Sequence, residues 1–353
     1  MKIRIAILEK DLIYLKRFAS SFTSKYSDKV EIYSFSDYDL AISNLESSKI
    51  DVFLACDSFN IDMERIPQRC AFGYLVELSD VDMLNEQKAI FKFQKIDLIY
   101  REILNIFSEK ESMISGFKTD KNGGKILMFT SVSGGTGTST VAASCAICFG
   151  ALGKKVFYLN LEEFGSSDVF FSSEGQYCMS DVIYNLKSKK SSLPIKIESI
   201  IKQDNRHVDF FSQPKTALDL LELDVADILL LIDMLISVCG YEYIIIDMPL
   251  KIDKNYLDVY KVIDDFVIVG DGSEISNLKI INAYNALQIK EQEWGISLTK
   301  KMSVIYNKFD NKTSNVINIS DFRNIGGITQ YKQATSQQIL SQISNMAMFK
   351  MLM

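Results

Sequence analysis

Short apolar runs alternate with stretches of helical period along the first part of the chain. Apolar residues recur at Leu12, Leu15, Phe18 and Phe22, a spacing typical of an amphipathic helix. The pattern of apolar positions predicts strands at Ile3–Leu8, Val30–Phe35, Val52–Ala55, Phe72–Val76 and Ala89–Phe93, and helices at Asp11–Phe22, Tyr38–Leu45 and Ile96–Phe107. Five short strands with helices between them indicate an open parallel α/β sheet.

A polar stretch, Ser108–Gly124, interrupts this rhythm and ends in two glycines, which is typical of a linker. We therefore expect a first domain at 1–110, a linker at 111–124 and a second domain at 125–353. In the second domain the α/β alternation resumes with longer units. The strands predicted there are Ile126–Phe129, Val156–Leu161, Asp209–Ser212, Tyr243–Ile246, Val262–Val269 and Met302–Tyr306, and the helices are Thr140–Ala151, Ala226–Val238 and Ile275–Glu291.

The second domain opens with a strand, a glycine-rich turn and a helix, in the stretch KILMFTSVSGGTGTS from Lys125 to Ser139. Gly134, Gly135 and Gly137 lack a Cβ, so this backbone can adopt positive φ and turn its N–H groups inward. The helix N-terminus that follows favours an anion. The stretch departs from G-x-x-x-x-G-K-[ST], because Val132 and Thr138 replace the first Gly and the Lys. Both a phosphate-binding loop and a tight turn without a ligand are compatible with it.

Composition and charge exclude several classes of function. The 353 residues carry a net charge of −6 with dispersed Lys and Arg, which argues against a broad nucleic-acid footprint. No apolar run approaches the ~18 residues of a spanning helix, and the charged N-terminus does not read as a signal peptide, so we expect a cytoplasmic protein. Cys145 and Cys148 lie in an apolar helix without a second pair, which favours reduced core thiols. With His207 as the sole histidine, a Ser/His/Asp hydrolase is not expected.

The segment YEYIIIDMP, Tyr241–Pro249, is an apolar strand that ends in an acid, as in a Walker B segment. At the carboxyl end of a parallel strand, Asp247 would lie near the glycine-rich loop and could hold the water shell of Mg²⁺. An Asp that only caps the strand is the alternative.

Together these segments resemble the ParA/MinD superfamily of deviant Walker A ATPases over 125–353. The matching segments are the loop Ser133–Ser139, Asn160-Leu161-Glu162 followed by Gly165, the D-x-P triplet Asp247-Met248-Pro249, Asn307, and the base-covering loop at Gly326–Tyr331. The resemblance implies a doubly wound, mainly parallel-sheet P-loop NTPase domain that binds ATP and Mg²⁺. It assigns ATP to Ser133, Gly134, Gly135, Thr136, Gly137, Thr138, Ser139 and Thr140, adenine to Asn307, Mg²⁺ to Ser139 and Asp247, and hydrolysis to Asp247, Asn160 and Glu162.

The departures from the family's pattern affect hydrolysis most. The family's two loop lysines are replaced by Ser133 and Thr138, and Asn160 replaces an acid. Loss of a charged donor costs about a hundred-fold or more in rate, so at most a weak ATPase is expected, whereas the backbone N–H groups can still bind nucleotide. Lys301, Lys308 or a lysine of a partner chain could supply the missing charge.

The first domain resembles a receiver (flavodoxin-like) domain of two-component signalling. The positions that correspond to the family's acidic cluster, phospho-acceptor and lysine are Glu9, Asp11, Asp57 and Lys95, with Cys56 an equally good alignment for the acceptor. Lys10 stands where Mg²⁺ would need a carboxylate, which favours a pseudo-receiver used for contacts. An unrelated flavodoxin-like domain remains the alternative.

A pseudo-receiver before such an ATPase domain resembles the TadZ/CpaE branch, whose members localise the tight-adherence (Flp) pilus secretion machinery. The resemblance implies a homodimeric scaffold, at a cell pole or the inner membrane face, that binds components of a pilus or secretion apparatus. An active ATPase switch, a nucleotide-free adaptor and a phosphorylation-controlled regulator are the alternatives.

The C-terminal stretch Thr335–Met353 has apolar residues at Ile339, Leu340, Ile343, Met346 and Phe349. Related proteins of the MinD type end in a membrane-binding amphipathic helix. Here Lys350 is the sole basic residue of the helical stretch from Ile339 onward, which favours a helix packed on the core.

Overall fold

A computed structural model describes residues 2–110, 123–165, 167–188, 192–319 and 322–353. The chain divides into two compact units. The first takes residues 1–118 and 188–200, and the second takes 119–187 and 201–353. The predicted linker, 111–124, lies outside the described residues except for Gly123 and Gly124. Each unit is an α/β sheet, so the predicted fold class is confirmed.

The first unit is a six-stranded sheet with the order β2-β1-β3-β4-β6-β5, parallel except for β5, which runs antiparallel to β6. Its elements are β1 (Ile3–Leu8), α1 (Leu12–Tyr26), β2 (Val30–Phe35), α2 (Tyr38–Ser47), β3 (Val52–Cys56), η1 (Met63–Arg65), β4 (Ala71–Val76), β5 (Met83–Leu84), β6 (Gln87–Phe91) and α3 (Ile96–Lys110). The five predicted strands and three predicted helices are all present. The bounds of β1 and β2 match the prediction to the residue.

Alternation along the strands of the first unit builds a core on each face of its sheet. In β1, Ile3, Ile5 and Ile7 join the cluster formed with α1 and α3, whereas Ala6 and Leu8 join the cluster formed with α2. Successive strand side chains point to opposite faces, so a strand buried on both sides is almost entirely apolar, and Arg4 is the exception in β1.

A helix from the later part of the sequence also belongs to the first unit. This is α7 (Leu193–Ile200), and its Ile195 joins the core cluster beneath α1 and α3. Its Glu198 pairs with Lys29 and accepts a hydrogen bond of 3.5 Å from the Tyr100 hydroxyl. Residues 188–200 thus group with the receiver-like fold although they lie inside the sequence of the second domain.

The second unit is an eight-stranded sheet with the order β14-β13-β12-β7-β11-β8-β10-β9, parallel except for β9, which runs antiparallel to β10. Its strands are β7 (Lys125–Thr130), β8 (Val156–Asn160), β9 (Lys202–Gln203), β10 (Val208–Phe210), β11 (Tyr243–Asp247), β12 (Asp265–Gly270), β13 (Met302–Phe309) and β14 (Arg323–Thr329). Its helices are α4 (Thr138–Ala151), α5 (Ser167–Phe170), α6 (Met179–Ser188), α8 (Ala217–Leu220), α9 (Val225–Ser237), α10 (Leu257–Val262), α11 (Glu274–Trp294) and α12 (Ser336–Ile343), with the 3₁₀ turns η2 (Lys254–Tyr256), η3 (Thr299–Lys301) and η4 (Ala347–Leu352).

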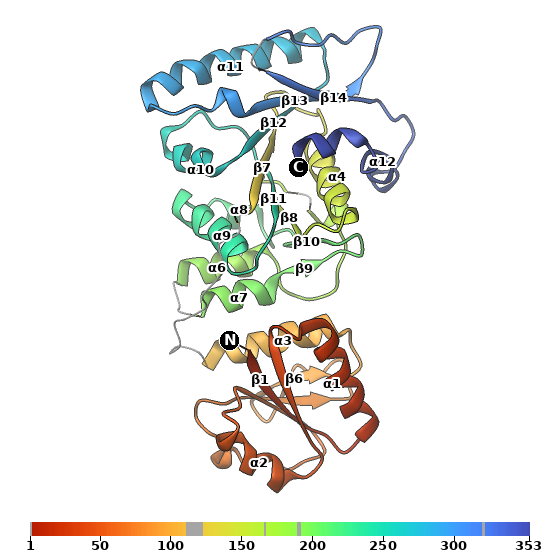
Figure 1. The fold of residues 1–353 in the computed structure, drawn as a ribbon, viewed down its shortest axis with the longest axis vertical. Coiled ribbons are helices and arrows are strands. Elements are labelled where there is room, and N and C mark those ends of the chain that lie inside the picture. The colour runs from red at the N-terminus through yellow and green to blue at the C-terminus, as the bar shows by residue number, and fades with distance from the viewer. Residues whose placement is uncertain (1, 111–122, 166, 189–191, 320–321) are drawn as a thin grey trace. The chain divides into compact units, whose positions relative to one another are not determined.

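Helices cover both faces of this sheet. Figure 1 shows α4 and α12 on one side of the strands and α9 and α10 on the other. The α4 face holds one continuous core in which Cys145 and Cys148 are buried as free thiols. The expectation of reduced core cysteines is therefore confirmed.

Several segments differ from the prediction, and two of them flank β13 in the sheet. Strand β12 begins at Asp265 because Leu257–Val262 form α10, so the predicted strand from Val262 was too long at its start. The segment Gly326–Tyr331 was expected to be a loop, but β14 continues through it to Thr329 beside β13.

The C-terminal segment packs on the core of the second unit, as expected. Leu340 and Ile343 of α12, with Phe349 and Leu352 of η4, are fully buried in the cluster that contains α4. Within the described residues, no helix has both the length and the apolarity needed to cross a bilayer.

The topology of the second sheet singles out one place on its edge. After β7 the chain winds toward β8 on one side, and after β11 it winds toward β12 on the other. The connections that leave the neighbouring strands β7 and β11 therefore diverge, and ligands of open α/β sheets bind at such a switch point, at the carboxyl ends of the strands.

Candidate functional site

The glycine-rich loop lies at this switch point, between the end of β7 at Thr130 and the start of α4 at Thr138. Gly135 and Gly137 have φ values of 74° and 80°, in the left-handed region that glycine adopts without strain. Gly137 is the N-cap of α4, and no side chain caps the helix there, so its first N–H groups remain available to a ligand. A Cβ on Gly137 would lie 2.5 Å from Nδ2 of Asn307, which makes glycine a steric requirement.

Hydroxyl groups hold the inside of the loop together. The Ser131 hydroxyl donates to the carbonyl oxygen of Ser133 at 2.7 Å, and the Thr136 hydroxyl donates to Ser131 Oγ at 3.0 Å. Thr138 Oγ1 lies 3.1 Å from Thr136 Oγ1, whereas Ser133 Oγ is buried without a partner. The two positions where the resemblance expects lysines therefore carry small neutral hydroxyls within the loop.

A cavity of about 610 Å³ opens above the loop. It is lined by Thr130, Ser131, Val132, Ser133, Gly134, Gly135, Thr136, Gly137, Thr138, Ser139, Thr140, Glu162, Asp247, Met248 and Pro249. This volume falls within the range of small-molecule sites, about 300–1,000 Å³. The structure thus brings all predicted loop residues to one cavity, together with Glu162 and Asp247.

Strand register places Asp247 at the floor of this cavity. Asp247, the last residue of β11, pairs with Phe129 of β7 on one side and with Asn160 of β8 on the other. Its Oδ2 accepts hydrogen bonds from the Tyr158 hydroxyl at 2.8 Å and from Asn160 Nδ2 at 3.3 Å. Tyr158 was not among the predicted site residues. The period of two along β8 could have identified it, because it puts residues 158 and 160 on the same face.

The other carboxylate oxygen of Asp247 is buried without a partner. The residue is only 1% exposed, and no described group donates a hydrogen bond to Oδ1. Burial raises the pKa of Asp247 to about 7, and the nearby Glu162 carboxylate acts in the same direction. A buried acceptor left in this state is costly unless a cation or a donor completes it.

The oxygens around Asp247 fit a magnesium ion. Ser139 in the first turn of α4 donates its hydroxyl to Glu162 Oε2 at 3.0 Å, and Asn160 Oδ1 accepts from the Glu162 backbone N–H at 2.9 Å. Hydroxyl and carboxylate oxygens are the ligands Mg²⁺ prefers, with waters and phosphates completing its octahedron. Among the described residues, no group of three or more His, Cys, Asp or Glu could hold a metal alone.

Asn307 and Lys308, near the end of β13, contact the backbone of the loop. Asn307 is buried and its Nδ2 donates to the Thr136 carbonyl oxygen at 2.7 Å. Lys308 Nζ donates to the Gly135 carbonyl oxygen at 2.6 Å. Lys301, which was also considered as a substitute cation, donates instead to the Ile263 carbonyl oxygen and precedes the amino end of β13, away from the loop.

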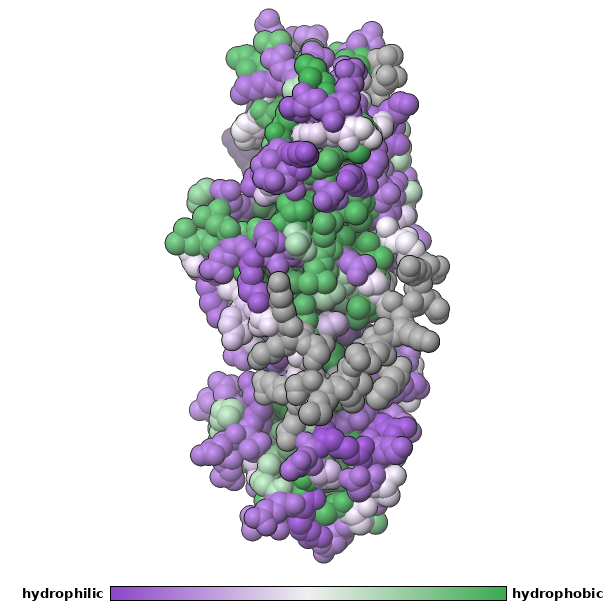
Figure 2. Space-filling model, turned by 90° about the vertical axis from the view of Figure 1, so that its left-hand side faces the viewer, coloured by the Kyte–Doolittle hydropathy of each residue, from purple (hydrophilic) through white to green (hydrophobic). Residues whose placement is uncertain are grey.

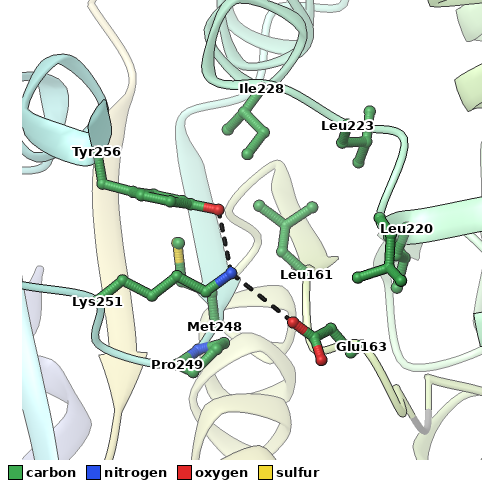
Figure 3. A pocket seen from close by; sticks show the side chains of 10 residues that line it. Leu161, Glu163, Leu220, Leu223, Ile228, Met248, Pro249, Lys251 and Tyr256 are labelled. Atoms are coloured by element: carbon green, nitrogen blue, oxygen red, sulfur yellow. Dashed lines mark hydrogen bonds and ion pairs between the residues drawn. The ribbon is translucent and has the colours of Figure 1, made fainter. Parts of the chain in front are cut away.

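A second, smaller pocket of about 90 Å³ shares Met248 and Pro249 with the cavity above the loop (Figure 3). Half of its lining residues are leucine or isoleucine. Lys251, which also lines it, contacts the Tyr256 hydroxyl at 3.1 Å and Glu163 at 3.8 Å. Figure 2 shows apolar side chains gathered on one face of the molecule. Leu218 and Leu221, in and next to α8, and Leu230 of α9 are exposed.

The corresponding edge of the first unit is closed by a buried lysine. Lys92, which directly follows β6, is 4% exposed, and its Nζ lies 2.7 Å from Oε2 of Glu9 and 3.0 Å from Oε1 of Glu77. Burial alone would raise the pKa of Glu9, but Lys92 and the Asp11 backbone N–H hold that pKa below its usual value. The Cys56 thiol at the end of β3 lies 3.9 Å from the same ammonium group.

The structure assigns different places to the other receiver-like residues. Asp11 is the N-cap of α1, where its Oδ1 accepts hydrogen bonds from the Ile13 and Tyr14 backbone N–H groups at 2.8 and 3.1 Å. Asp57 and Lys95 are exposed. The buried lysine is Lys92 because β6 ends at Phe91, two residues earlier than predicted.

Comparisons with known proteins agree with this two-part organisation. Residues 1–108 match the family model described as TadZ-like, receiver domain. No curated protein sequence matches the chain at a significant level.

The second part resembles solved structures of ParA and MinD proteins. A ParA family ATPase from Chlorobium tepidum TLS superposes with a TM-score of 0.51 at 21% identity, over 65% of this chain and 96% of that chain. The septum site-determining protein MinD complexed with Mg-ADP from Pyrococcus horikoshii OT3 superposes with a TM-score of 0.48 at 14% identity, over 63% of this chain and 95% of that chain. At these identities the likeness to the ParA family ATPase establishes the fold alone.

Proposed function

We propose that this chain, which joins a TadZ-like receiver domain to a ParA/MinD-type fold, binds ATP with Mg²⁺ at the glycine-rich loop of its second unit. One observation carries the proposal most directly. The buried Asp247 carboxylate, with an unpartnered oxygen, lies at the floor of a cavity whose wall is a glycine-rich turn and an uncapped helix N-terminus. A metal–phosphate group satisfies both the free carboxylate oxygen and the free N–H groups.

Each residue has a defined part in this binding mode. The backbone N–H groups from Gly134 to Ser139 bind phosphate oxygens, and Ser139 and Asp247 hold Mg²⁺, which would neutralise phosphate charge there. Tyr158 and Asn160 orient the Asp247 carboxylate through its other oxygen. Asn307 holds the loop at Thr136, and the adenine remains assigned to it by resemblance.

Hydrolysis by this arrangement is expected to be weak or absent. Neither Ser133 nor Thr138 can place a positive charge on the transferred phosphoryl group, and Asn160 cannot act as a base toward water. Ground-state binding depends on backbone donors and Mg²⁺, which these substitutions leave in place. ATP would therefore act as a structural ligand or a slow switch.

The biological role that fits these parts is a homodimeric scaffold that marks where a tight-adherence pilus or secretion apparatus assembles. This step rests on the TadZ-like receiver domain and on the resemblance of the whole arrangement to the TadZ/CpaE branch. A fluorescent fusion should form discrete foci in cells that assemble the apparatus. Unchanged, uniform fluorescence with and without the apparatus would contradict the scaffold role.

The binding proposal is tested by the melting temperature of the protein with and without ATP and Mg²⁺, followed by phosphate release from the same sample. A ligand at 100 times its Kd stabilises the folded state by about 2.7 kcal/mol. We expect a clear upward shift that EDTA removes, with little phosphate released. A shift with steady turnover would favour an active ATPase, and no shift at saturating ATP would favour a nucleotide-free adaptor.

A further inference from the structure

Two consecutive side chains of β13 reach the same loop, which a regular strand does not allow. Asn307 donates to the Thr136 carbonyl oxygen and Lys308 donates to the Gly135 carbonyl oxygen, at 2.7 and 2.6 Å. In a regular strand successive side chains point to opposite faces of the sheet. The backbone must therefore depart from the pleat between these two residues.

That departure is visible in the backbone of Lys308. Its φ is 58°, in the left-handed region that non-glycine residues rarely adopt, and the register of β13 with β14 shifts between Tyr306 and Phe309. Strained backbone of this kind persists only where the surroundings enforce it, and it is concentrated at ligand sites. Here the strain delivers an ammonium group to the glycine-rich loop.

The ammonium group of Lys308 is not neutralised by an acid. Lys308 is exposed, and within the described residues no carboxylate lies within ion-pair distance of its Nζ. A carbonyl oxygen accepts its hydrogen bond but leaves its full positive charge uncompensated. The loop itself carries no basic residue from Ser131 to Thr140.

We infer that Lys308 is the cation of the phosphate-binding loop, supplying from β13 the positive charge that Ser133 and Thr138 do not provide. The inference rests on the proposed nucleotide site and adds a residue to it. In phosphate-binding loops of the G-x-x-x-x-G-K-[ST] type, the lysine that neutralises phosphate charge belongs to the loop. Here β13, which is separated from β7 by β12, brings it, and the Gly135 carbonyl oxygen holds it in place.

The chain offers a matched control next to the other end of β13. Lys301 also donates to a backbone carbonyl oxygen, that of Ile263 at 2.6 Å, but it lies before the amino end of β13. Lys301→Met and Lys308→Met remove the same charge and the same kind of hydrogen bond from opposite ends of one strand. Any difference in nucleotide affinity between the two variants is therefore due to the position of the lysine relative to the glycine-rich loop.

The experiment is a calorimetric titration of the full chain and its variants with ATP, ADP and AMP, each in the presence of Mg²⁺. We expect Lys308→Met to weaken ATP binding about ten-fold or more and AMP binding much less, because the interaction scales with phosphate charge. Lys301→Met should bind as the wild type does, and Lys308→Arg should retain most of the affinity. The affinity of wild type for ATP should also fall more steeply with salt than that of Lys308→Met.

Equal ATP affinity of Lys308→Met and wild type would overturn the inference and leave the nucleotide site standing. An equal loss for ATP and AMP would overturn it too, because Lys308 would then only shape the loop. No binding by the wild type would overturn the proposed nucleotide site, and this inference with it. Melting temperatures of both Met variants within a degree or two of each other would confirm that the comparison is made on folded protein.

Discussion

Both units place a buried acid at the carboxyl edge of a mostly parallel sheet, Glu9 after β1 in the first and Asp247 at the end of β11 in the second. They are almost equally inaccessible, at 3% and 1% exposure. Lys92 lies 2.7 Å from the Glu9 carboxylate, whereas the groups that donate hydrogen bonds to Asp247, among them Tyr158 and Asn160, are neutral. The pKa of Glu9 is accordingly held below its usual value, and that of Asp247 is raised to about 7.

The difference shows how one architecture can be either closed or open to a ligand. In the first unit the ammonium group of Lys92, which follows β6, neutralises the charge of the buried acid, so no added cation is needed there. Among the described residues, Glu9 Oε2 and Asp247 Oδ1 both lack a hydrogen-bond donor, so the two edges differ in charge. In the second unit, no described lysine lies within ion-pair distance of Asp247, and one carboxylate oxygen has no partner. The charge of a bound metal ion can complete that site, and this is the physical reason for expecting ligand binding in the second unit and not in the first.

The largest effect is expected from removing the lysine that closes the first edge. Lys92→Met leaves Glu9 buried without its counter-charge, which typically costs about 3–5 kcal/mol of unfolding free energy. Urea denaturation of the full chain measures it. Lys25→Met is the control, because its pair with Asp97 is partly exposed and such pairs contribute about 1 kcal/mol or less. Equal losses in the two variants would show that the buried pair has no special role.

Removing the buried charge of Asp247 at the edge of the second sheet is expected to stabilise the protein at high pH, in contrast to the loss of stability expected for Lys92→Met. Since the pKa of Asp247 is raised from 3.8 to about 7, its contribution to stability is largest at low pH and is lost as the pH rises through 7. Asp247→Asn removes this dependence, so without ligand the variant should match wild type near pH 4 and exceed it at pH 8 by about 1–3 kcal/mol. Its stabilisation by ATP and Mg²⁺ should be lost.

Thermal melts from pH 4 to 8, with and without ATP and Mg²⁺, make this measurement. Asp233→Asn on the exposed side of α9 serves as the control and should change little at any pH. A loss of stability of Asp247→Asn at pH 8 would mean that the carboxylate is satisfied in the protein, and that the second edge is as closed as the first.

A smaller effect is expected from the turn that shapes the open site. Gly137→Ala places a side chain at a φ of 80° and brings its Cβ within 2.5 Å of Asn307 Nδ2, so we expect a loss of about 1–3 kcal/mol and weaker nucleotide binding. Gly134→Ala is the matched control, since nothing lies within 4 Å of its Cβ position and its φ is not in the left-handed region. Denaturation measures the stability of both variants, and calorimetry measures their affinity for nucleotide. A larger loss of either quantity in Gly134→Ala than in Gly137→Ala would contradict this role of Gly137.

The smallest effect concerns Asp11, which the receiver resemblance placed at a metal site. Asp11 is the N-cap of α1. Asp11→Ala should therefore lower the free energy of unfolding by about 1 kcal/mol, whereas Asp11→Asn should leave it almost unchanged, because Asn caps helices equally well. A metal ligand would behave differently, because Asn would then impair Mg²⁺ binding. A melting temperature that rises with Mg²⁺ alone in wild type and not in Asp11→Asn would contradict the closed state of the first edge.

The fold was predictable where apolar periodicity is strong. Strands such as Ile3–Leu8 and Val30–Phe35 are bounded by polar residues, and their limits follow from composition alone. The short helices between β8 and β11 were missed. The helix α7, for example, has eight residues and is buried by packing with the first unit, so its sequence shows no exposed polar face.

The sequence allowed the glycine-rich loop and the acid at the end of β11 to be predicted. It did not reveal which lysines lie close to the buried acids and to the loop. The glycine spacing and the acid at the end of an apolar strand identified the loop and Asp247, since both follow from local sequence. Which acid is neutralised depends on side chains that approach from other strands. Lys92 was missed because the predicted strand ran through it to Phe93, whereas β6 ends at Phe91 and leaves Lys92 at the edge of the sheet. The position of Lys308 depends on a left-handed residue, which local pattern does not reveal.

The most direct test of the contrast between the two edges is amide hydrogen exchange of the full chain with and without ATP and Mg²⁺. We expect slower exchange at 131–140 and 243–249, where the loop N–H groups and Asp247 meet the ligand, and no change at 9–14, 56–59 and 92–95. Protection confined to the first unit, or no protection anywhere at saturating ATP, would contradict this contrast.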